Sequence, residues 1–232
     1  MRFRNRVDAG RVLAGRLARY ADRDDALVLA LPRGGVPVGY EVATILHVPL
    51  DVFVVRKLGL PGQPELAMGA IASGGILVLN REVLDQVSVP PAVLGAVVEA
   101  EQRELERRER QYRGAAPPPA VEGRIAILVD DGLATGSTMR AAAAAVRQRA
   151  PASVVVAVPV APKTTCEALK ADPNVDEVVC AVTPESFSAV GLWYEDFAQT
   201  SDEEVRELLA RAGERGSSAG DAARGPATRL PK

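Results

Sequence analysis

Short, nearly uninterrupted apolar runs punctuate the chain. They cover Ala26–Leu31, Asp51–Val55, Ile125–Val129, Ala152–Val160 and Glu177–Val182. Runs of this length and composition are typical of parallel strands that are buried on both faces of a sheet. Longer stretches with helical spacing of apolar residues separate most of them. The pattern predicts an α/β fold built on about five parallel strands.

Amphipathic periodicity places helices around these strands. The helical stretches are Val7–Tyr20, Val38–Leu46, Ala92–Gly114, Met139–Arg149, Thr164–Ala171 and Ser201–Arg211. The third ends in alternating Glu and Arg at i,i+4 spacing, which favours a solvated helix face over a nucleic-acid patch. The last begins with a capping box formed by Ser201 and Glu204, and Asn80–Leu94 has no clear period. Residues 212–232 are Gly, Ser, Ala, Arg and Pro without periodicity, so we expect one domain over 1–211 and a disordered tail.

The loop after Ile125–Val129 carries the densest chemistry in the chain. Asp130 and Asp131 come at the strand end, and the glycines that follow permit a tight turn and close approach of backbone to a ligand. A helix begins next, with Ser137 or Thr138 expected as its cap. A glycine loop that feeds a helix N-terminus points several backbone N–H groups at one spot, which suits a phosphate.

The two acids predict a second contact to the same ligand. Carboxylates beside a phosphate would repel it, whereas they accept hydrogen bonds from the hydroxyls of a sugar diol. One loop can therefore hold a phosphate by its amides and a ribose by Asp130 and Asp131. The alternative is a βα turn with solvated acids, which the strand before and Thr135–Thr138 after disfavour. A Walker A loop would need a lysine where Ser137 stands, and this stretch lacks the Gly-x-Gly-x-x-Gly dinucleotide fingerprint.

A second strand, glycine loop and helix surround Pro32–Gly39. Because the carboxyl ends of parallel strands gather at one edge of a sheet, this loop should lie near the first. Arg33 would then project its cation into the crevice between them, unless it is an exposed turn residue. Arg56 and Lys57 follow the next strand and would place two more cations at this edge, where they can neutralise a departing anion. The alternative for both is a solvated turn.

The stretch Ile127–Met139 resembles the diphosphoribosyl-binding motif of the type I phosphoribosyltransferases. These enzymes bind phosphoribosyl pyrophosphate (PRPP) and, with magnesium, exchange its pyrophosphate for a nitrogenous base. The resemblance implies that Asp130 and Asp131 hold the ribose hydroxyls. It assigns the 5-phosphate to a cradle made of Ala134, Thr135, Gly136, Ser137 and Thr138.

The resemblance extends to the cationic positions. The segment around Arg33, Gly34 and Gly35 resembles the pyrophosphate loop of the family, and Arg56-Lys57 is similar to the Arg-Lys of adenine and orotate phosphoribosyltransferases. The magnesium would be held chiefly by PRPP oxygens and water, which suits a cation that keeps its hydration. A homodimer is the expectation for this family.

The implied fold is a parallel-sheet core with a small hood, built around the helix near residue 100, and a flexible lid. The first half of Gly59–Gly75, rich in Gly and Pro, is expected to be the lid, with strands at Ala67–Ala72 and Ile76–Asn80. A closing lid would exclude water from the cationic sugar that forms as the anomeric bond breaks. Glu65 is the candidate for shuttling a proton on the base nitrogen, and an exposed loop acid is the alternative.

Four aromatic residues near the C-terminus form a cluster in a chain otherwise poor in them: Phe187, Trp193, Tyr194 and Phe197. They either cover the sheet edge or offer a ring to a flat heterocycle. The segment loosely resembles one in 6-oxopurine phosphoribosyltransferases whose Phe stacks on the purine, which makes Phe187 the base-stacking candidate. Ala134 stands where those enzymes carry a catalytic Asp, so a purine-like base is favoured but its identity is open. The chain looks most like small bacterial phosphoribosyltransferase-like proteins with an unassigned base.

The composition of the chain limits the kinds of partner that we expect for it. A net charge of −2 over 232 residues gives no global attraction to nucleic acid or to an anionic membrane. No apolar run approaches the ~18 residues of a membrane span, and no signal-peptide core follows the basic N-terminus, so we expect a cytoplasmic protein. Cys166 and Cys180 are expected to be reduced. The single histidine, His47, cannot support a multi-histidine metal site, and we expect it to be structural.

These observations predict PRPP-dependent transfer of phosphoribose to a nitrogenous base, as in nucleotide metabolism. A second hypothesis is a non-catalytic sensor that binds PRPP or a nucleotide and regulates a partner. Intact Arg33 and Lys57 favour the enzyme. A third hypothesis is a hydrolase or phosphorylase of a ribose phosphate that uses the same pocket.

Overall fold

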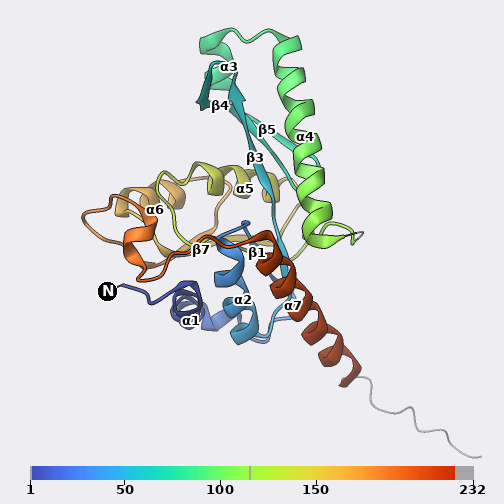
Figure 1. Ribbon diagram of the computed structural model, residues 1–232, viewed down its shortest axis with the longest axis vertical. Coiled ribbons are helices and arrows are strands. Elements are labelled where there is room, and N and C mark those ends of the chain that lie inside the picture. The colour runs from blue at the N-terminus through green and yellow to red at the C-terminus, as the bar shows by residue number, and fades with distance from the viewer. Residues whose placement is uncertain (1, 115, 223–232) are drawn as a thin grey trace, which may run out of the picture.

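The computed structural model describes residues 2–114 and 116–222, without the side chains of Glu65 and of residues 216–222. The chain forms a layered body and an arm that projects from it (Figure 1). The body contains one parallel sheet of β1 (Ala26–Ala30), β2 (Leu50–Val52), β6 (Ile125–Val129), β7 (Ser153–Val160) and β8 (Glu177–Val182). Its strand order is β2-β1-β6-β7-β8. The predicted α/β fold with five parallel strands is confirmed.

Alternate residues of the central strands bury against opposite helical layers. Val28 and Ile127 face one core and Leu29 and Leu128 face the other, as the two-residue period of a strand requires. Both layers are apolar, and every residue of β1 and β6 is buried. This explains why these strands read as continuous apolar runs.

Helices cover both faces of the sheet. They are α1 (Arg6–Arg16), α2 (Gly35–Leu46), α5 (Ser137–Arg147) and α6 (Lys163–Lys170), and α7 (Asp202–Ala222) closes the C-terminal side. The layer of α1 and α2 lies against one face, and α5 and α6 lie against the other. Short 3₁₀ helices follow at Ala18–Tyr20 and Val190–Trp193. None of the helices over the described residues is long and apolar enough to cross a membrane.

The arm is the inserted segment between β2 and β6 (Figure 1). It consists of an antiparallel sheet of β3 (Val55–Leu60), β4 (Gln63–Ala72) and β5 (Ile76–Leu79), followed by α3 (Arg81–Val87) and α4 (Pro91–Arg113). The sheet packs its inner face against α4 through residues that include Leu58, Met68 and Leu105. The predicted hood is therefore present, and it includes the segment around Asn80 that showed no period.

The predicted lid loop is wrong in its first half. Gln63–Ala72 is one continuous strand that pairs with β3, so Glu65 lies in a hairpin rather than in a loop. Pro61 and Gly62 form the turn, and Gly62 has φ +85°, which is the conformation that the third position of a type II turn requires. The glycine and proline content of this segment therefore indicates turns and close strand approach.

Two further expectations change. Cys166 and Cys180 form a disulfide that ties α6 to β8, which contradicts the expected reduced thiols. Helix α7 continues past the predicted end at Arg211 as far as Ala222, while residues 223–232 of the predicted tail lie outside the described residues. His47 ends α2 with φ +55°, and its Nδ1 lies 2.8 Å from Oδ1 of Asp22 at the surface.

Candidate functional site

The two glycine loops meet at the carboxyl edge of β1 and β6, which are neighbours in the sheet. The Leu31 amide donates to the Val129 carbonyl at 2.8 Å, so the first loop starts beside the end of β6. A Cβ at Gly35 would lie 2.7 Å from the Val129 oxygen. Only glycine allows this approach of the two backbones. The peptide bond between Pro32 and Arg33 is cis.

Gly34 lies directly over the acidic pair. A Cβ at Gly34 would be 2.0 Å from Oδ2 and 2.7 Å from Cγ of Asp131. The predicted pyrophosphate loop and the predicted ribose-binding acids are therefore in contact, as the sequence analysis expected from the shared sheet edge.

Asp131 is held by an arginine that sequence reasoning missed. Nε and one terminal nitrogen of Arg6 lie 2.9 Å and 2.8 Å from Oδ2 of Asp131, and the two side chains are 12% and 14% exposed. The hydroxyl of Tyr194 donates to the backbone carbonyl of Asp131 at 2.5 Å. Arg6 is separated from Asp131 by 125 positions, and no local pattern marks it among the arginines of the N-terminus.

The pKa values of Asp130 and Asp131 are set by their burial, by their proximity to each other and by the nearby charge of Arg6. Burial raises the pKa of Asp130 well above its usual range, and the neighbouring charge of Asp131 raises it further. Burial also raises the pKa of Asp131, while the Arg6 guanidinium acts in the opposite direction. Asp130 accepts a 2.8 Å hydrogen bond from the Asp131 amide. The pair thus shares one strong cationic partner, and that partner is bound to Asp131.

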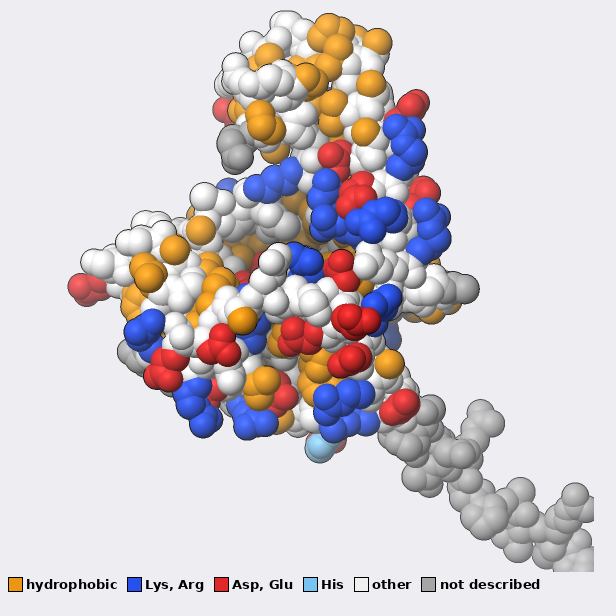
Figure 2. All heavy atoms as spheres, in the orientation of Figure 1, with side chains coloured by type: hydrophobic (Ala, Val, Ile, Leu, Met, Phe, Trp, Pro, Cys, Tyr) orange, Lys and Arg blue, Asp and Glu red, His pale blue; other side chains and the backbone are white. Residues whose placement is uncertain are grey.

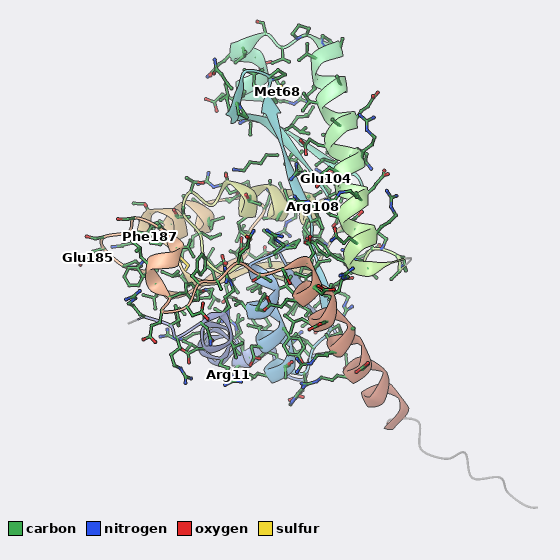
Figure 3. All side chains as sticks on the ribbon, viewed as in Figure 1. Arg11, Met68, Glu104, Arg108, Glu185 and Phe187 are labelled. Atoms are coloured by element: carbon green, nitrogen blue, oxygen red, sulfur yellow. A yellow bond between two sulfur atoms is a disulfide. The ribbon has the colours of Figure 1, made fainter. Side chains whose placement is uncertain are left out.

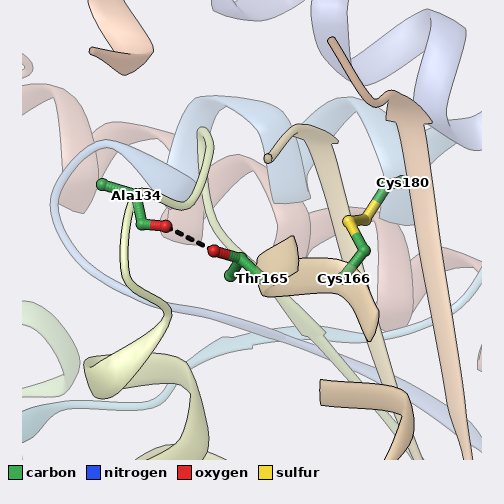
Figure 4. Close-up of a disulfide and its surroundings, with 4 residues drawn as sticks. All are labelled: Ala134, Thr165, Cys166 and Cys180. Atoms are coloured by element: carbon green, nitrogen blue, oxygen red, sulfur yellow. Dashed lines mark hydrogen bonds between the residues drawn. A yellow bond between two sulfur atoms is a disulfide. The ribbon is translucent and has the colours of Figure 1, made fainter. Parts of the chain in front are cut away.

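Backbone groups of the loop after β6 form hydrogen bonds that hold it against α6 and β7. Thr165 of α6 donates its hydroxyl to the Ala134 carbonyl at 2.6 Å (Figure 4), and the Leu133 amide donates to Val160 at 2.9 Å. Among the described residues, no group accepts a hydrogen bond from the amides of Thr135 and Gly136. The loop therefore presents free N–H groups at the N-terminus of α5, which is the geometry of an anion site.

The predicted cap of this helix is wrong. Gly136 occupies the N-cap position with φ +72°, and no side chain caps the helix, so Ser137 and Thr138 are its first two residues. Gly136 has no side chain that could accept a hydrogen bond from the first amides of the helix. The side chain of Thr135 stays near the turn, because its Oγ1 lies 3.4 Å from the Ser137 amide.

The predicted cations lie at different places. Arg33 is half-buried beside the loop, 3.8 Å from Oδ1 of Asp202 at the start of α7. Arg56 and Lys57 do not stand at the end of a parallel strand, as predicted, because β2 ends at Val52 and the chain continues into β3 of the arm. The position of the two cations is therefore set by the arm.

On the arm, the two cations point to opposite faces of its sheet. Nε of Arg56 bonds Oε2 of Glu101 on α4 at 2.7 Å. Lys57 is exposed, lacks an ion-pair partner in the described part of the chain, and lines a cavity of about 540 Å³ together with Ser137 and Arg140 of α5. Figure 2 shows Lys and Arg side chains gathered where the arm meets the body. Lys57 thus lies across from the start of α5, where the second glycine loop ends.

The remaining candidates lie farther from this centre. Phe187 is half-buried and packs on an apolar cluster that contains Phe3 and Tyr194, at the side of the body away from the arm (Figure 3). The ring centroids of Tyr194 lie 5.6 Å from Phe3 and 4.9 Å from Phe197. The cluster also contains Val182 of β8, the strand at this edge of the sheet, so these aromatic residues cover the sheet edge, which is the packing alternative of the sequence analysis.

No protein metal cage is evident. Over residues 2–114 and 116–222, no three His, Cys, Asp or Glu side chains gather in a metal-binding arrangement.

Comparisons with known proteins agree with this geometry. The family described as the phosphoribosyl transferase domain matches residues 3–190. The protein named "Putative phosphoribosyl transferase" in two strains of Mycobacterium tuberculosis is 48% identical over 210 residues, which are 90% of this chain and 47% of the relative. The chain thus spans about half the length of these relatives. The crystal structure of TT1426 from Thermus thermophilus has 44% identity and a TM-score of 0.81, covering 91% of this chain and 99% of that one.

Proposed function

The chain belongs to the phosphoribosyl transferase domain family, and from that premise we propose that it moves phosphoribose between pyrophosphate and a nitrogenous base, using PRPP and Mg²⁺. One observation carries the proposal. An acidic pair lies between two glycine loops at one sheet edge, and the second loop has open amides at a helix N-terminus. That arrangement fits a sugar diol flanked by two phosphate groups.

Each part of PRPP has a chemically matched partner in the proposed complex. The amides at the start of α5 bind the 5-phosphate, helped by the positive end of the helix dipole. Asp130 and Asp131 accept hydrogen bonds from the ribose hydroxyls. Their negative charge also stabilises the positive charge that develops on the sugar ring as the anomeric bond breaks.

The pyrophosphate would lie over the first glycine loop. Gly34 and Gly35 pack their backbone against Asp131 and Asp130, so this loop lies next to the acids that would hold the ribose. Arg33 stands beside this loop and Lys57 faces the body from the arm. Their cations would neutralise charge on the departing group.

The residues at this crevice fit Mg²⁺ held mainly by the substrate. Mg²⁺ favours octahedral oxygen coordination, keeps several waters, and is often bound through substrate phosphates. The lack of a three-ligand cluster among the described residues fits that mode. When bound, the ion would neutralise pyrophosphate oxygens.

The acceptor is a nitrogenous base, for which a purine is favoured by the resemblance of the sequence around Phe187. Glu65 keeps its role as candidate proton shuttle, now from a strand of the arm.

The first experiment is calorimetric titration of PRPP with Mg²⁺ into the purified protein and into an Asp130→Asn/Asp131→Asn variant. We expect binding by the wild type and a large loss in the variant, with a cooperative thermal unfolding transition in both proteins as the control for folding. A panel of purines and pyrimidines, scored by pyrophosphate release, then identifies the acceptor. The absence of PRPP binding by well-folded wild type, with or without bases, would refute the proposal.

A PRPP or nucleotide sensor is the second candidate. The specific observation in its favour is that two of the predicted pyrophosphate cations have acidic partners within the chain, Arg33 with Asp202 and Arg56 with Glu101. A sensor would bind PRPP in the titration above and release no pyrophosphate with any base.

A further inference from the structure

Arg6 connects the N-terminal segment and the segment 193–198 with the acidic pair. It is the first residue of α1, and the Asn5 side chain fixes this start by accepting a 3.0 Å hydrogen bond from the Asp8 amide. The segment before it runs beside the C-terminal segment, since the Phe3 amide donates to the Trp193 carbonyl at 2.8 Å. The backbone therefore delivers Arg6 to one defined place.

The guanidinium of Arg6 is held on all sides. Two of its nitrogens bond Oδ2 of Asp131 at 2.9 Å and 2.8 Å, and the third donates to the Ala198 carbonyl at 2.6 Å. Its centre lies 4.0 Å from the centroid of the Phe197 ring, a cation–π distance. Three attachments leave this group no freedom to turn away from the acid.

As a consequence, the two carboxylate oxygens of Asp131 have different surroundings. Oδ2 is saturated by Arg6 and covered by Gly34. No other described residue donates a hydrogen bond to Oδ1, and it is not among the fully buried polar atoms that lack a partner. Oδ1 is therefore the oxygen left to meet a ligand.

From this geometry, and resting on the proposed function, we propose that Arg6 is the positioning residue of the ribose site. It fixes the Asp131 carboxylate so that Oδ1 is presented to a ribose hydroxyl, and it supplies the cation that lets a carboxylate stand beside Asp130. Arg6 itself touches no substrate. Its effect should therefore fall on recognition of the sugar diol and leave phosphate recognition at α5 intact.

The test compares Arg6→Gln and Arg6→Lys with Arg11→Gln as the matched control. Arg11 lies on the same helix and bonds Oε2 of Glu41 at 2.9 Å, but it is 59% exposed and lies on the outer side of the body (Figure 3). Binding of PRPP with Mg²⁺ is measured by calorimetry, and folding by thermal unfolding. The same proteins are titrated with ribose 5-phosphate and with 2-deoxyribose 5-phosphate, which lacks one hydroxyl of the diol.

We expect the wild type and Arg11→Gln to prefer ribose 5-phosphate over the deoxy sugar. Arg6→Gln should bind PRPP at least about tenfold more weakly, the size of one lost hydrogen bond to a charged group, and should lose the preference for the diol. Arg6→Lys, which keeps the charge but not the paired geometry, should recover part of both. If Arg6→Gln did not fold, Arg6→Lys alone would still have to show an intermediate preference.

The outcomes separate the two proposals. If the wild type binds no PRPP, the proposed function fails and this role fails with it. If the wild type binds PRPP and folded Arg6→Gln binds both sugar phosphates as the wild type does, the role of Arg6 alone is overturned. An equal loss for both sugar phosphates would also overturn it, because that result describes a purely structural ion pair.

Discussion

Gly34→Ala tests whether the first glycine loop packs directly against the acidic pair, as the short distances from Gly34 to Asp131 indicate. The three nearest heavy atoms to a Cβ at this position all belong to Asp131, with Oδ2 at 2.0 Å, Cγ at 2.7 Å and Oδ1 at 3.3 Å. Ordinary contact begins near 3.4 Å. The carboxylate would therefore have to retreat by more than about 1 Å, and such a shift breaks its bonds to Arg6.

The cost can be estimated from this geometry. Forcing an extra methyl into packed surroundings costs about 1–3 kcal/mol, and losing hydrogen bonds to a charged group costs about 1.5–3 kcal/mol. Gly34 has φ −58° and ψ −33°, which alanine adopts readily, so the smaller entropy of the unfolded alanine chain returns about 0.4–1 kcal/mol. We expect a net loss of about 1.5–5.5 kcal/mol in the free energy of unfolding.

The assay is urea unfolding of a double-mutant cycle. Because the three nearest atoms to the new methyl group all belong to the Asp131 carboxylate, Gly34→Ala should cost much less in an Asp131→Ala background. Gly95→Ala is the control, since this exposed helical glycine has no atom near its Cβ and should stabilise the protein by up to about 1 kcal/mol. Additive losses in the cycle, or a wild-type midpoint for Gly34→Ala, would refute the contact between the two loops.

Three further predictions concern the phosphate loop, the acids and the disulfide. Gly136→Ala and Gly123→Ala both place alanine at positive φ, +72° and +68°, so each should lower the free energy of unfolding, measured with urea, by about 1–2 kcal/mol. Only Gly136→Ala should weaken PRPP binding. Equal PRPP binding by the two variants would contradict the assignment of the phosphate loop. The raised pKa of Asp130 means that the folded protein binds this proton more tightly than the unfolded chain does. The stability that this group contributes is therefore full below its usual pKa of 3.8 and is lost as pH rises through the folded pKa; urea midpoints of wild type and Asp130→Asn should diverge in that direction, and parallel profiles would contradict it. Cys166→Ser and Cys180→Ser should each lower the free energy of unfolding by about 3 kcal/mol, because the disulfide closes a loop of 14 positions. Dithiothreitol should leave the stability of these variants unchanged and should lower the stability of the wild type to their level.

The body of the fold could be predicted because its signals are local. Each residue of Ile125–Val129 is buried between two helical layers, so the strand is apolar at every position and its predicted bounds are those observed. The same holds for the two glycine loops, whose contact follows from strand order at one sheet edge. In these segments the residue pattern of the sequence is enough to predict the position of the segment in the fold.

The arm shows where that agreement ends. Gly59–Gly75 carries turn residues at both ends and a strand between them, and only its pairing with β3 makes it a hairpin. Arg56 and Lys57 follow an apolar run, but the run crosses from one sheet into another after Val52. The partner strand β3 directly precedes the turn at Pro61 and Gly62, but glycine and proline also stand within both strands, at Gly59, Pro64 and Gly69, so the segment reads as a flexible loop.

Charge balance at the acidic pair is a property of the whole chain. Two carboxylates at a buried strand end raise each other's cost of ionisation, and a sheet-edge loop has no cation of its own beside Asp131. The structure recruits Arg6 from the N-terminal helix and secures it with the Phe197 ring and the Ala198 carbonyl. The loop sequence therefore identifies the two acids, while Arg6 and the segment around Phe197 and Ala198 determine how the Asp131 carboxylate is held.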